Sequence, residues 1–333
     1  MQEIYKKVAE KWKIFYIDFA FKVWYTLVYF ERRKHKSMRK IWKKTASFAL
    51  ILAIVGGIGA MMPSSRAEEN QPIEADVIQN QEYRSQNDIE VSVYINGEKM
   101  QSRGKLIEDT TYMPLRSSVE EWESSDIHWH NGIASVKSDT VEISVQQGSQ
   151  YITANGRILY NTKPIKNIDG RIYVPIRLLA KAYSLSVEWE GVTRSVKLYG
   201  DPKGLKNADA FYNKDDLYWL SRIIQAESGG ESLRGKIAVG NVVINRKNHK
   251  SYPNTIYGVI FDKKYGTQFT PVATGTIYKT PSSESVLAAK ICLDGFSLNS
   301  EMIFFINPKI ATNFWITQSC TYVMTVGNHK FYK

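Results

Sequence analysis

The stretch "IIQAESGGES", residues 223 to 232, places one glutamate where a helix should end and a second just beyond two glycines. At 100° per residue, Glu227 falls beside Leu220 and Ile223, on the edge of the apolar helix face. Desolvation and the negative potential at a helix C-terminus both disfavour a carboxylate, so Glu227 should hold its proton longer than a free glutamate. A general acid for glycosidic bonds needs that property. The alternative is a glutamate at an amphipathic edge, with its carboxylate in water.

The elements that would position Glu227 follow from the helical periodicity that begins near Lys206. "NKDDLYWLSRIIQAES" should start at an N-cap of Asp215 or Asp216 and stop at Gly229 and Gly230, in left-handed or irregular backbone. Further helices are expected in "SLRGKIAVGNVVINRKN", where Gly240 permits close approach, in "IYGVIF" after the cap of "YPNT", and in "PSSESVLAAKICLDG". We expect "KKYGTQFTPVATGT" to be a long loop lining a cleft, and "IFFINP", "NFWI" and "VGNHKFY" to be short strands.

Upstream of these helices, one unit of about sixty residues occurs twice. "YINGEKM" returns as "TANGRIL", "YMPLR" at 112–116 returns as "YVPIR" at 173–177, and "HWHNGIASVKS" returns as "EWEGVTRSVKL". Each unit carries the Asn-Gly hairpin signal, a strand ending at Pro-x-Arg, a short helix and two more strands. Residues 90–200 are therefore expected to form a duplicated small α+β domain, after a polar linker at 68–89.

Other candidate side chains in the chain have structural explanations. His128 and His130 share a strand face, but no third ligand has suitable spacing nearby, so solvated strand residues are favoured over a metal site. Arg116 and Arg177 recur in the repeat, and repetition indicates a structural role, such as bonding carbonyls at the strand end. Two buried free thiols are favoured over a disulfide for Cys292 and Cys320.

The net charge of +11 belongs to the N-terminus, where residues 1–44 hold 13 Lys and Arg against 4 Asp and Glu. From Glu68 onward the counts are 30 and 29, which removes the basic domain face that nucleic-acid binding needs. The uncharged run 46–62 between "MRKIWKKT" and "PSSRA" predicts a signal peptide over 38–67, cut after Ala67.

The alternative for this run is an uncleaved anchor, because seventeen residues are marginal for a spanning helix. Residues 1–37 are interpreted as an extension upstream of a true start at Met38, or else as an aromatic-rich helix on the inner membrane surface. Membrane contact is expected only through these segments, and the protein is expected to be exported. The sequence gives no oligomeric state.

Eight motifs occur in order over about residues 214–333: "IIQAESGGES", "GKIAVGNVVINR", "YPNTIYGVIF", "QFTPVATG", "AAKICLDG", "FFINP", "FWI" and "GNHKFY". In these the chain resembles the cell-wall hydrolases of the spore-cortex-lytic type (SleB/CwlJ). The resemblance implies a mainly α catalytic domain over 206–333, similar in fold to lysozymes and lytic transglycosylases, with Glu227 at the position of the catalytic glutamate. The repeats resemble the N-terminal domain of copper amine oxidases, a stalk module, and imply no copper.

The same resemblance suggests further site residues. Glu231 takes the second acidic position of the motif, which implies a supporting role; the alternative is a helix-start carboxylate favoured by the dipole. Five others could bind sugar through amides or aromatic faces, with core packing as the alternative for each aromatic: Gln268, Phe269, Asn307, Trp315 and Trp219. Asn245, Arg246 and His329 are expected to hold the fold together.

Together these features predict an exported α+β enzyme that cleaves the glycan strand of peptidoglycan, in spore cortex or vegetative wall, without metal or cofactor. A hydrolase ordinarily needs two carboxylates, whereas one suffices if the sugar's own 6-hydroxyl attacks, as in a lytic transglycosylase. An amidase would need a zinc ligand set, and the domain offers only His249 and His329, in unsuitable contexts. A non-catalytic wall-binding protein is the remaining alternative.

Overall fold

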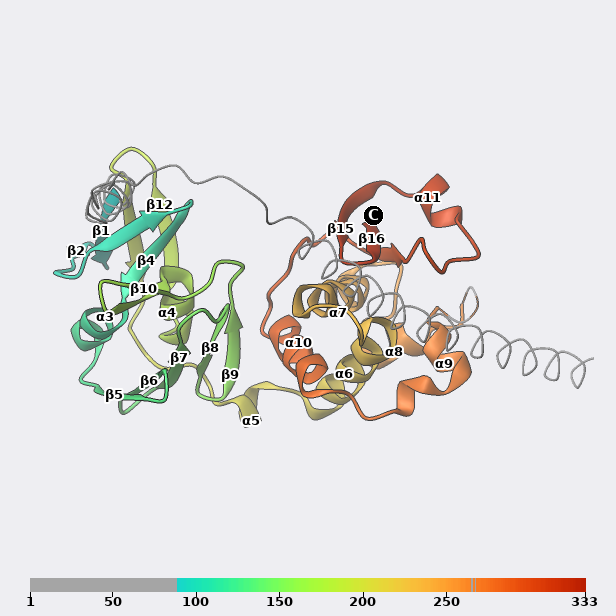
Figure 1. Ribbon diagram of the computed structural model, residues 1–333, viewed down its shortest axis with the longest axis horizontal. Helices are drawn as coiled ribbons and strands as arrows, with labels where there is room; N and C mark the ends of the chain where they lie inside the picture. The colour runs from blue at the N-terminus through green and yellow to red at the C-terminus, as the bar shows by residue number, and fades with distance from the viewer. Residues whose placement is uncertain (1–88, 265, 267) are drawn as a thin grey trace, which may run out of the picture. The chain divides into compact units, whose positions relative to one another are not determined.

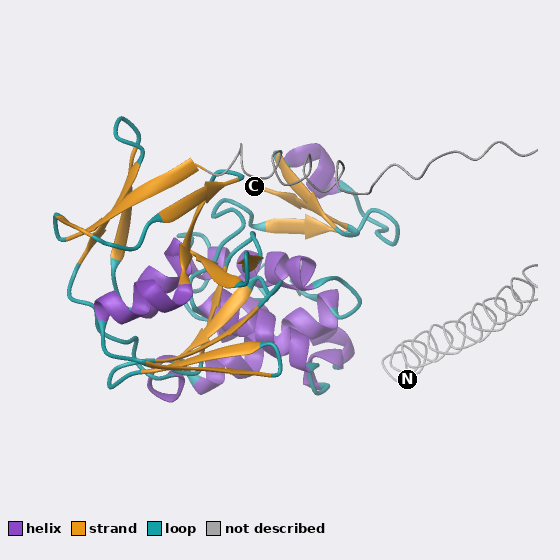
Figure 2. Cartoon of the chain, turned by 60° about the vertical axis from the view of Figure 1, so that its left-hand side comes forward, coloured by secondary structure: helices purple, strands orange, loops and turns teal. Residues whose placement is uncertain are grey.

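The computed structural model describes residues 89–264, 266 and 268–333 as a mixed α+β structure. A β-rich region with two sheets is followed by a mainly helical region that ends in a small sheet near the C-terminus (Figures 1 and 2). This confirms the expected fold class. The expected signal or anchor segment, the extension before it and nearly all of the linker lie outside the described residues. Of the helices in the described ranges, none is long and apolar enough to cross a membrane.

The β-rich region contains an eight-stranded and a five-stranded sheet. The eight-stranded sheet has the order β10-β11-β4-β3-β1-β13-β12, with β2 paired to β1. Its strands are β1 (Ile89–Ile95), β2 (Glu98–Lys99), β3 (Gly104–Ile107), β4 (Thr110–Pro114), β10 (Lys166–Ile168), β11 (Arg171–Pro175), β12 (Ser186–Glu190) and β13 (Ser195–Tyr199). The five-stranded sheet runs in chain order through β5 (Asp126–His130), β6 (Ile133–Lys137), β7 (Glu142–Gln146), β8 (Tyr151–Ala154) and β9 (Arg157–Tyr160).

The two sequence repeats share both sheets instead of folding as separate modules. β4 of the first repeat pairs antiparallel with β11 of the second, with Met113 opposite Val174. Because residues 61 apart are equivalent, the flanking pairs Tyr112–Pro175 and Pro114–Tyr173 exchange under a local two-fold axis through that central pair. The helices α3 (Leu115–Trp122) and α4 (Ile176–Ala182) follow at once, and one continuous core joins both repeats. Sharing strands lets each repeat cover apolar surface that it could not bury alone.

The helical region is built on three packed helices: α6 (Lys214–Ser228), α7 (Leu233–Asn248) and α10 (Ser283–Leu293). Shorter elements surround them, namely α5 (Ala208–Phe211), α8 (Ile256–Phe261), α9 (Thr270–Thr274), the 3-10 helix η1 (Thr276–Tyr278) and α11 (Trp315–Ser319). The last sheet has the order β14-β16-β15, from β14 (Phe304–Ile306), β15 (Tyr322–Val326) and β16 (His329–Tyr332). Gly240 of α7 is needed as expected, because a Cβ there would lie 2.7 Å from the Cys292 sulfur.

α6 ends at Gly229 as predicted, but its N-cap residue and the backbone at Gly229 differ from the prediction. The N-cap is Asn213, whose side chain accepts hydrogen bonds from the backbone N–H groups of Asp215 and Asp216. The two aspartates lie in the first turn instead, where their charge favours the helix dipole. Gly229 has helical backbone, with φ −54°, so it does not serve a left-handed cap. A Cβ at Gly229 would approach the Gln225 side-chain nitrogen to 2.3 Å, which explains the glycine by space.

Two segments of the C-terminal half are more helical than predicted. The expected long loop contains α9 and ends at the first residue of η1, with Pro271 in the first turn of α9 and Gly275 at a φ of +74° between the two. "NFWI" begins α11 and is not a strand. The Asn313 side chain accepts from the backbone N–H of Trp315, and this local bond favours a helical turn over extended backbone.

A buried polar cluster joins the strand β9 to the end of α10. Arg157 donates to Asp294 through two nitrogens, at 2.6 and 3.4 Å, and both side chains are buried. The Tyr212 hydroxyl donates to the same carboxylate at 2.5 Å. Ile158 and Tyr160 of β9 belong to the core of the helical region. The β-rich and helical regions are therefore joined by buried surface as well as by the chain.

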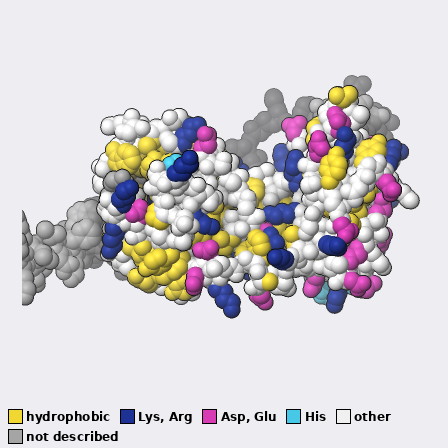
Figure 3. All heavy atoms as spheres, turned by 180° about the vertical axis from the view of Figure 1, so that it is seen from behind, with side chains coloured by type: hydrophobic (Ala, Val, Ile, Leu, Met, Phe, Trp, Pro, Cys, Tyr) yellow, Lys and Arg dark blue, Asp and Glu magenta, His cyan; other side chains and the backbone are white. Residues whose placement is uncertain are grey.

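Charged side chains of both signs are interspersed on the face drawn in Figure 3. Hydrophobic side chains gather in several patches between them. This distribution agrees with the balanced charge counted from Glu68 onward, and no single-sign field is visible on that face.

Candidate active site

A cleft of about 880 Å³ opens in the helical region, at the end of α6. Its walls come from several segments: the α6–α7 junction, the end of α7 with residues 251–252, Asp262 with residues 268–270, residues 304–316 and the start of β16. The ionisable and amide side chains among the lining residues are Glu227, Glu231, Arg246, Tyr252, Asp262, Gln268, Asn307 and His329. The helix end and the small sheet thus bring Glu227 to a concave surface.

Glu227 is half-buried in this cleft. Burial raises the pKa of its carboxyl to about 7, and the nearby Arg246 charge opposes that rise. Within residues 89–264, 266 and 268–333, nothing donates a hydrogen bond to the carboxyl group, so desolvation dominates. A carboxyl with these properties is partly protonated near neutral pH and can exchange a proton with a bound ligand.

Arg246 lies at the end of α7 and lines the same cleft. Its Nε donates to the carbonyl of Ile303 at 2.7 Å, which fixes the strand β14 against α7. Its guanidinium carbon lies 5.2 Å from the ring centres of both Tyr252 and Phe269. Its Nη1 is buried and has no hydrogen-bond partner among the described residues. Arg246 therefore supplies fixed positive charge that can stabilise a carboxylate at Glu227.

Glu231 has the opposite environment. Its carboxylate accepts from the side-chain nitrogen of Asn328 at 2.8 Å and from the Asn328 backbone N–H at 3.3 Å. His329 Nδ1 lies 3.7 Å away. These interactions, led by the Asn328 side chain, lower the pKa of Glu231. A Cβ at Gly327 would lie 2.0 Å from a Glu231 oxygen, so the β15–β16 turn closes tightly on the carboxylate.

The sequence comparisons divide the chain in the same way as the fold. The sequence profile of the family described as Cell Wall Hydrolase matches residues 230–332, and that of the copper amine oxidase N-terminal domain matches residues 94–198. Residues 230–332 form a cell wall hydrolase domain. Residues 94–198 form a copper amine oxidase N-terminal domain, which we call the stalk domain. The first match begins just after Glu227.

Curated relatives of the hydrolase domain are spore cortex-lytic enzymes. The enzyme of Bacillus cereus is 34% identical over 122 residues, which are 37% of this chain and 46% of the relative. That of Bacillus subtilis is 30% identical over 125 residues, 38% of this chain and 40% of the relative. The chain thus spans less than half the length of the curated relatives it matches.

A solved structure is similar over the same part of the chain. The catalytic domain of the germination-specific lytic transglycosylase SleB from Bacillus anthracis is 34% identical. The match covers 37% of this chain and 97% of that one, with a TM-score of 0.34. The identities to the curated relatives make the hydrolase domain homologous to the spore cortex-lytic enzymes, at 30% to 34% identity.

Most of the predicted sugar-binding residues line the cleft of the hydrolase domain. Gln268, Asn307 and Trp315 all do, and Trp315 is 45% exposed, with its ring packed edge-on against Phe304 at 5.5 Å. Phe269 also lines the wall, but it is 2% exposed and belongs to the core. Its ring supports Arg246 and offers no face for stacking.

Trp219 does not line the cleft in the part of the chain that the structure describes. It lies in an aromatic cluster with Tyr218 on α6, Tyr257 and Phe261 on α8, and Tyr278, with ring centres 4.9 to 6.2 Å apart. Its packing joins α6 to α8. The Trp219 indole therefore packs against other aromatic rings, and the residue type alone did not distinguish this role from sugar binding.

Sequence reasoning missed four ionisable lining residues: Arg246, Tyr252, Asp262 and His329. Arg246 and His329 were expected to hold the fold together, and both also face the cleft. Asn245 does hold the fold, since its side chain donates to the carbonyls of Met302 and Asn299 at 2.8 and 3.0 Å. One sequence feature could have indicated Arg246: it lies on the helix that directly follows the Glu227 motif, about four turns after the N-cap Ser232.

The structure also describes the histidines and cysteines for which the sequence favoured a structural role. His130 lies on β5 beside Asn131, with 2.9 Å between Nε2 and the amide nitrogen. Within the described ranges, no group of three His, Cys, Asp or Glu side chains is arranged to hold a metal ion. Cys292 is a buried free thiol as expected, while the free thiol Cys320 is only half-buried.

Proposed function

We propose that the hydrolase domain cleaves the glycan strand of peptidoglycan as a lytic transglycosylase, with Glu227 as its one acid and base. The observation that carries the proposal is the contrast between the two carboxyls of the motif. Burial raises the pKa of Glu227 to about 7, whereas hydrogen bonds lower that of Glu231. Paired carboxyls whose environments separate their pKa values indicate which one acts as the acid.

The chemistry needs no second carboxylate in this scheme. Glu227 donates its proton to the glycosidic oxygen as the bond from that oxygen to C1 of the muramic sugar breaks. The 6-hydroxyl of the same sugar attacks C1 and forms a C1–O6 bond, and Glu227 then takes the hydroxyl proton. No water is consumed, so the product ends in a 1,6-anhydro sugar. Arg246 stabilises the Glu227 carboxylate between the two proton transfers.

Glu231 serves positioning in this scheme. Its carboxylate holds the β15–β16 turn through Asn328, and its backbone carbonyl accepts from the buried Lys236 at 2.6 Å. Lys236 also pairs with Glu284 on α10. The junction between α6 and α7 is thereby fixed at the point where Glu227 enters the cleft.

Sugar binding is assigned to the cleft rim. Trp315 lines the cleft and is 45% exposed, and an exposed ring beside a polar cleft matches the apolar face of a pyranose ring. Asn307 and Gln268 supply amide groups nearby. The homology to spore cortex-lytic enzymes favours cortex peptidoglycan as the substrate. We further propose that the segment at 38–67 directs export and that the catalytic domain extends over 206–333.

The test uses the full exported chain and isolated peptidoglycan. Glu227→Gln should lower the cleavage rate by about 10³-fold or more, because the amide keeps the shape of the side chain and cannot donate the proton. Glu301→Gln, an exposed glutamate paired with Lys333 in the same domain, is the matched control and should cleave like the parent.

Asp262 also lines the cleft, so hydrolysis with a second carboxylate is the rival mechanism. If Glu227 acts alone, Asp262→Asn should retain most of the activity and still yield anhydro ends. A Glu227→Gln protein that cuts at the parent rate would overturn the assignment of the acid. Reducing muramic ends that disappear in Asp262→Asn would replace the transglycosylase with a two-carboxylate hydrolase.

A further inference from the structure

The stalk domain contains two pockets built from equivalent residues of its two repeats. The Trp189 pocket has a volume of about 530 Å³ and the Trp129 pocket about 630 Å³. Each contains the Pro-x-Arg corner of one repeat and the tryptophan of the same repeat's edge strand. The equivalent lining residues are Pro175, Arg177 and Trp189 in one pocket, and Pro114, Arg116 and Trp129 in the other.

Each pocket is completed by the other repeat. The β3–β4 turn, with Asp109, contributes to the Trp189 pocket, and the equivalent β10–β11 turn, with Gly170, contributes to the Trp129 pocket. This exchange is the one that the local two-fold axis through Met113 and Val174 requires. The chain has thus built the same concave site twice, and neither repeat could build it alone.

The tryptophans are exposed where burial would be the default for so large a side chain. Trp129 is 55% exposed and Trp189 is 40% exposed. Both lie on edge strands, β5 and β12, opposite small or branched residues: Ala134 in one case and Val196 in the other. Each indole therefore forms a pocket wall with one face available to a ligand.

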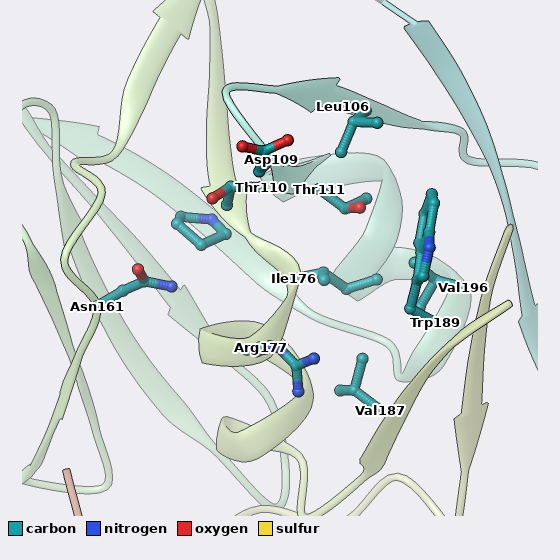
Figure 4. A pocket seen from close by; sticks show the side chains of 11 residues that line it. Leu106, Asp109, Thr110, Thr111, Asn161, Ile176, Arg177, Val187, Trp189 and Val196 are labelled. Atoms are coloured by element: carbon teal, nitrogen blue, oxygen red, sulfur yellow. The ribbon is translucent and has the colours of Figure 1, made fainter. Parts of the chain in front are cut away.

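Arginine supplies the polar group beside each indole. Figure 4 shows Arg177 extending from the start of α4, with Val187 and Trp189 on one side and Asn161 on the other. Arg177 is exposed and has no ion pair or hydrogen bond to another described residue. Among the described residues, Arg116 is held only by Glu120 of its own helix, at 3.3 Å. Repetition of these arginines was first interpreted as structural, but neither one bonds a strand-end carbonyl within residues 89–264, 266 and 268–333.

We propose that the two pockets bind the glycan strand of the cell wall, one saccharide segment in each. An indole face beside a guanidinium matches a pyranose ring, whose C–H face is apolar and whose hydroxyl, acetamido and carboxylate groups accept hydrogen bonds. The Trp189 pocket adds the amide of Asn161. A ligand that repeats along its length explains why one site occurs twice, since two weak sites on one polymer bind through avidity. The choice of glycan rests on the function proposed for the hydrolase domain.

The experiment measures binding without cleavage, in the full exported chain carrying Glu227→Gln. Sedimentation with insoluble peptidoglycan gives the affinity for the polymer, and calorimetry with chitotetraose gives the number of sites. Trp129→Ala and Trp189→Ala should each lower the affinity for the polymer by about 10- to 100-fold, since each leaves one stalk site. Each should also remove one chitotetraose site and leave the others unchanged.

Matched variants separate ligand contact from folding. Trp189→Phe keeps a ring and should retain most of the affinity, while Arg177→Gln should weaken the Trp189 pocket alone. Tyr199→Ala is the control, because Tyr199 is 42% exposed on the neighbouring strand β13 and lines neither pocket. It should bind like the parent.

Three outcomes decide the proposal. Loss of one site per tryptophan supports it, whether or not the parent protein with Glu227 proves to cleave glycan. A double Trp→Ala protein that folds and still binds peptidoglycan like the parent overturns it. Binding to peptidoglycan that depends on both tryptophans, with no chitotetraose site lost, also overturns it, because the ligand would then not be the saccharide.

Discussion

The buried contact between Arg157 of the stalk domain and Asp294 of the hydrolase domain should contribute measurably to stability. Asp294 accepts from Arg157 and Tyr212 and lies 3.5 Å from the Lys181 ammonium, with its side chain only 1% exposed. Asp294→Asn keeps the volume and removes the charge, which leaves the buried Arg157 guanidinium without its counterion. Removing one partner of a buried ion pair costs about 3–5 kcal/mol. We therefore expect Asp294→Asn to lower the free energy of unfolding by about 3 kcal/mol.

Urea unfolding of the full chain at pH 7 measures this change. With a denaturant slope of about 3 kcal/mol/M for a unit of this size, the midpoint should fall by about 1 M. The control is Asp201→Asn, which breaks the exposed pair with Lys203, where both side chains are about 70% exposed. It should leave the midpoint unchanged, because exposed pairs contribute little. Equal midpoints for Asp294→Asn and the control would refute the argument that this cluster joins the two regions.

Three further predictions concern the cleft. The cleavage rate should fall as the pH rises through about 7, because burial raises the pKa of Glu227 to that value and the acid must be protonated; a rate that instead rises from pH 6 to 8 would contradict this. Trp315→Ala should raise the KM for peptidoglycan fragments about tenfold with kcat little changed, whereas Trp219→Ala should leave the KM unchanged and lower stability by about 2 kcal/mol. Glu231→Gln should lower stability at pH 7 by about 1.5–3 kcal/mol, and its unfolding curve should approach that of the parent as the pH falls well below 4.5, since the lowered pKa contributes stability only above the folded value; a constant difference down to that pH would argue against the charge.

The local features of the fold could be predicted because neighbouring residues determine them. The Asn-Gly turns have Asn96 and Asn155 at a φ of 50°, as that dipeptide favours, and Gly295 has the positive φ that follows α10. The exchange of strands between the repeats could not be predicted. It depends on the pairing of β4 with β11, which are sixty residues apart, and either repeat has the same local pattern with or without the exchange.

The candidate site shows the same division. Glu227 was predicted from its place at the end of one amphipathic helix together with the motifs that resemble the hydrolase family, and both are visible in the sequence. Arg246 was not, because its charge becomes part of the cleft only when Phe269, Tyr252 and Ile303 surround it. Trp219 and Trp315 carry the same indole, and only the packing of α8 against α6 separates a structural ring from an exposed one.

The central claim is that Glu227 alone serves a reaction in which the sugar, and not water, attacks. Digestion of cortex peptidoglycan in H₂¹⁸O, with the fragments identified by mass, tests it most directly. The account predicts 1,6-anhydro muramic ends that carry no ¹⁸O, and no fragments in the Glu227→Gln digest. Reducing muramic ends that carry one ¹⁸O would contradict it, because water would then be the nucleophile.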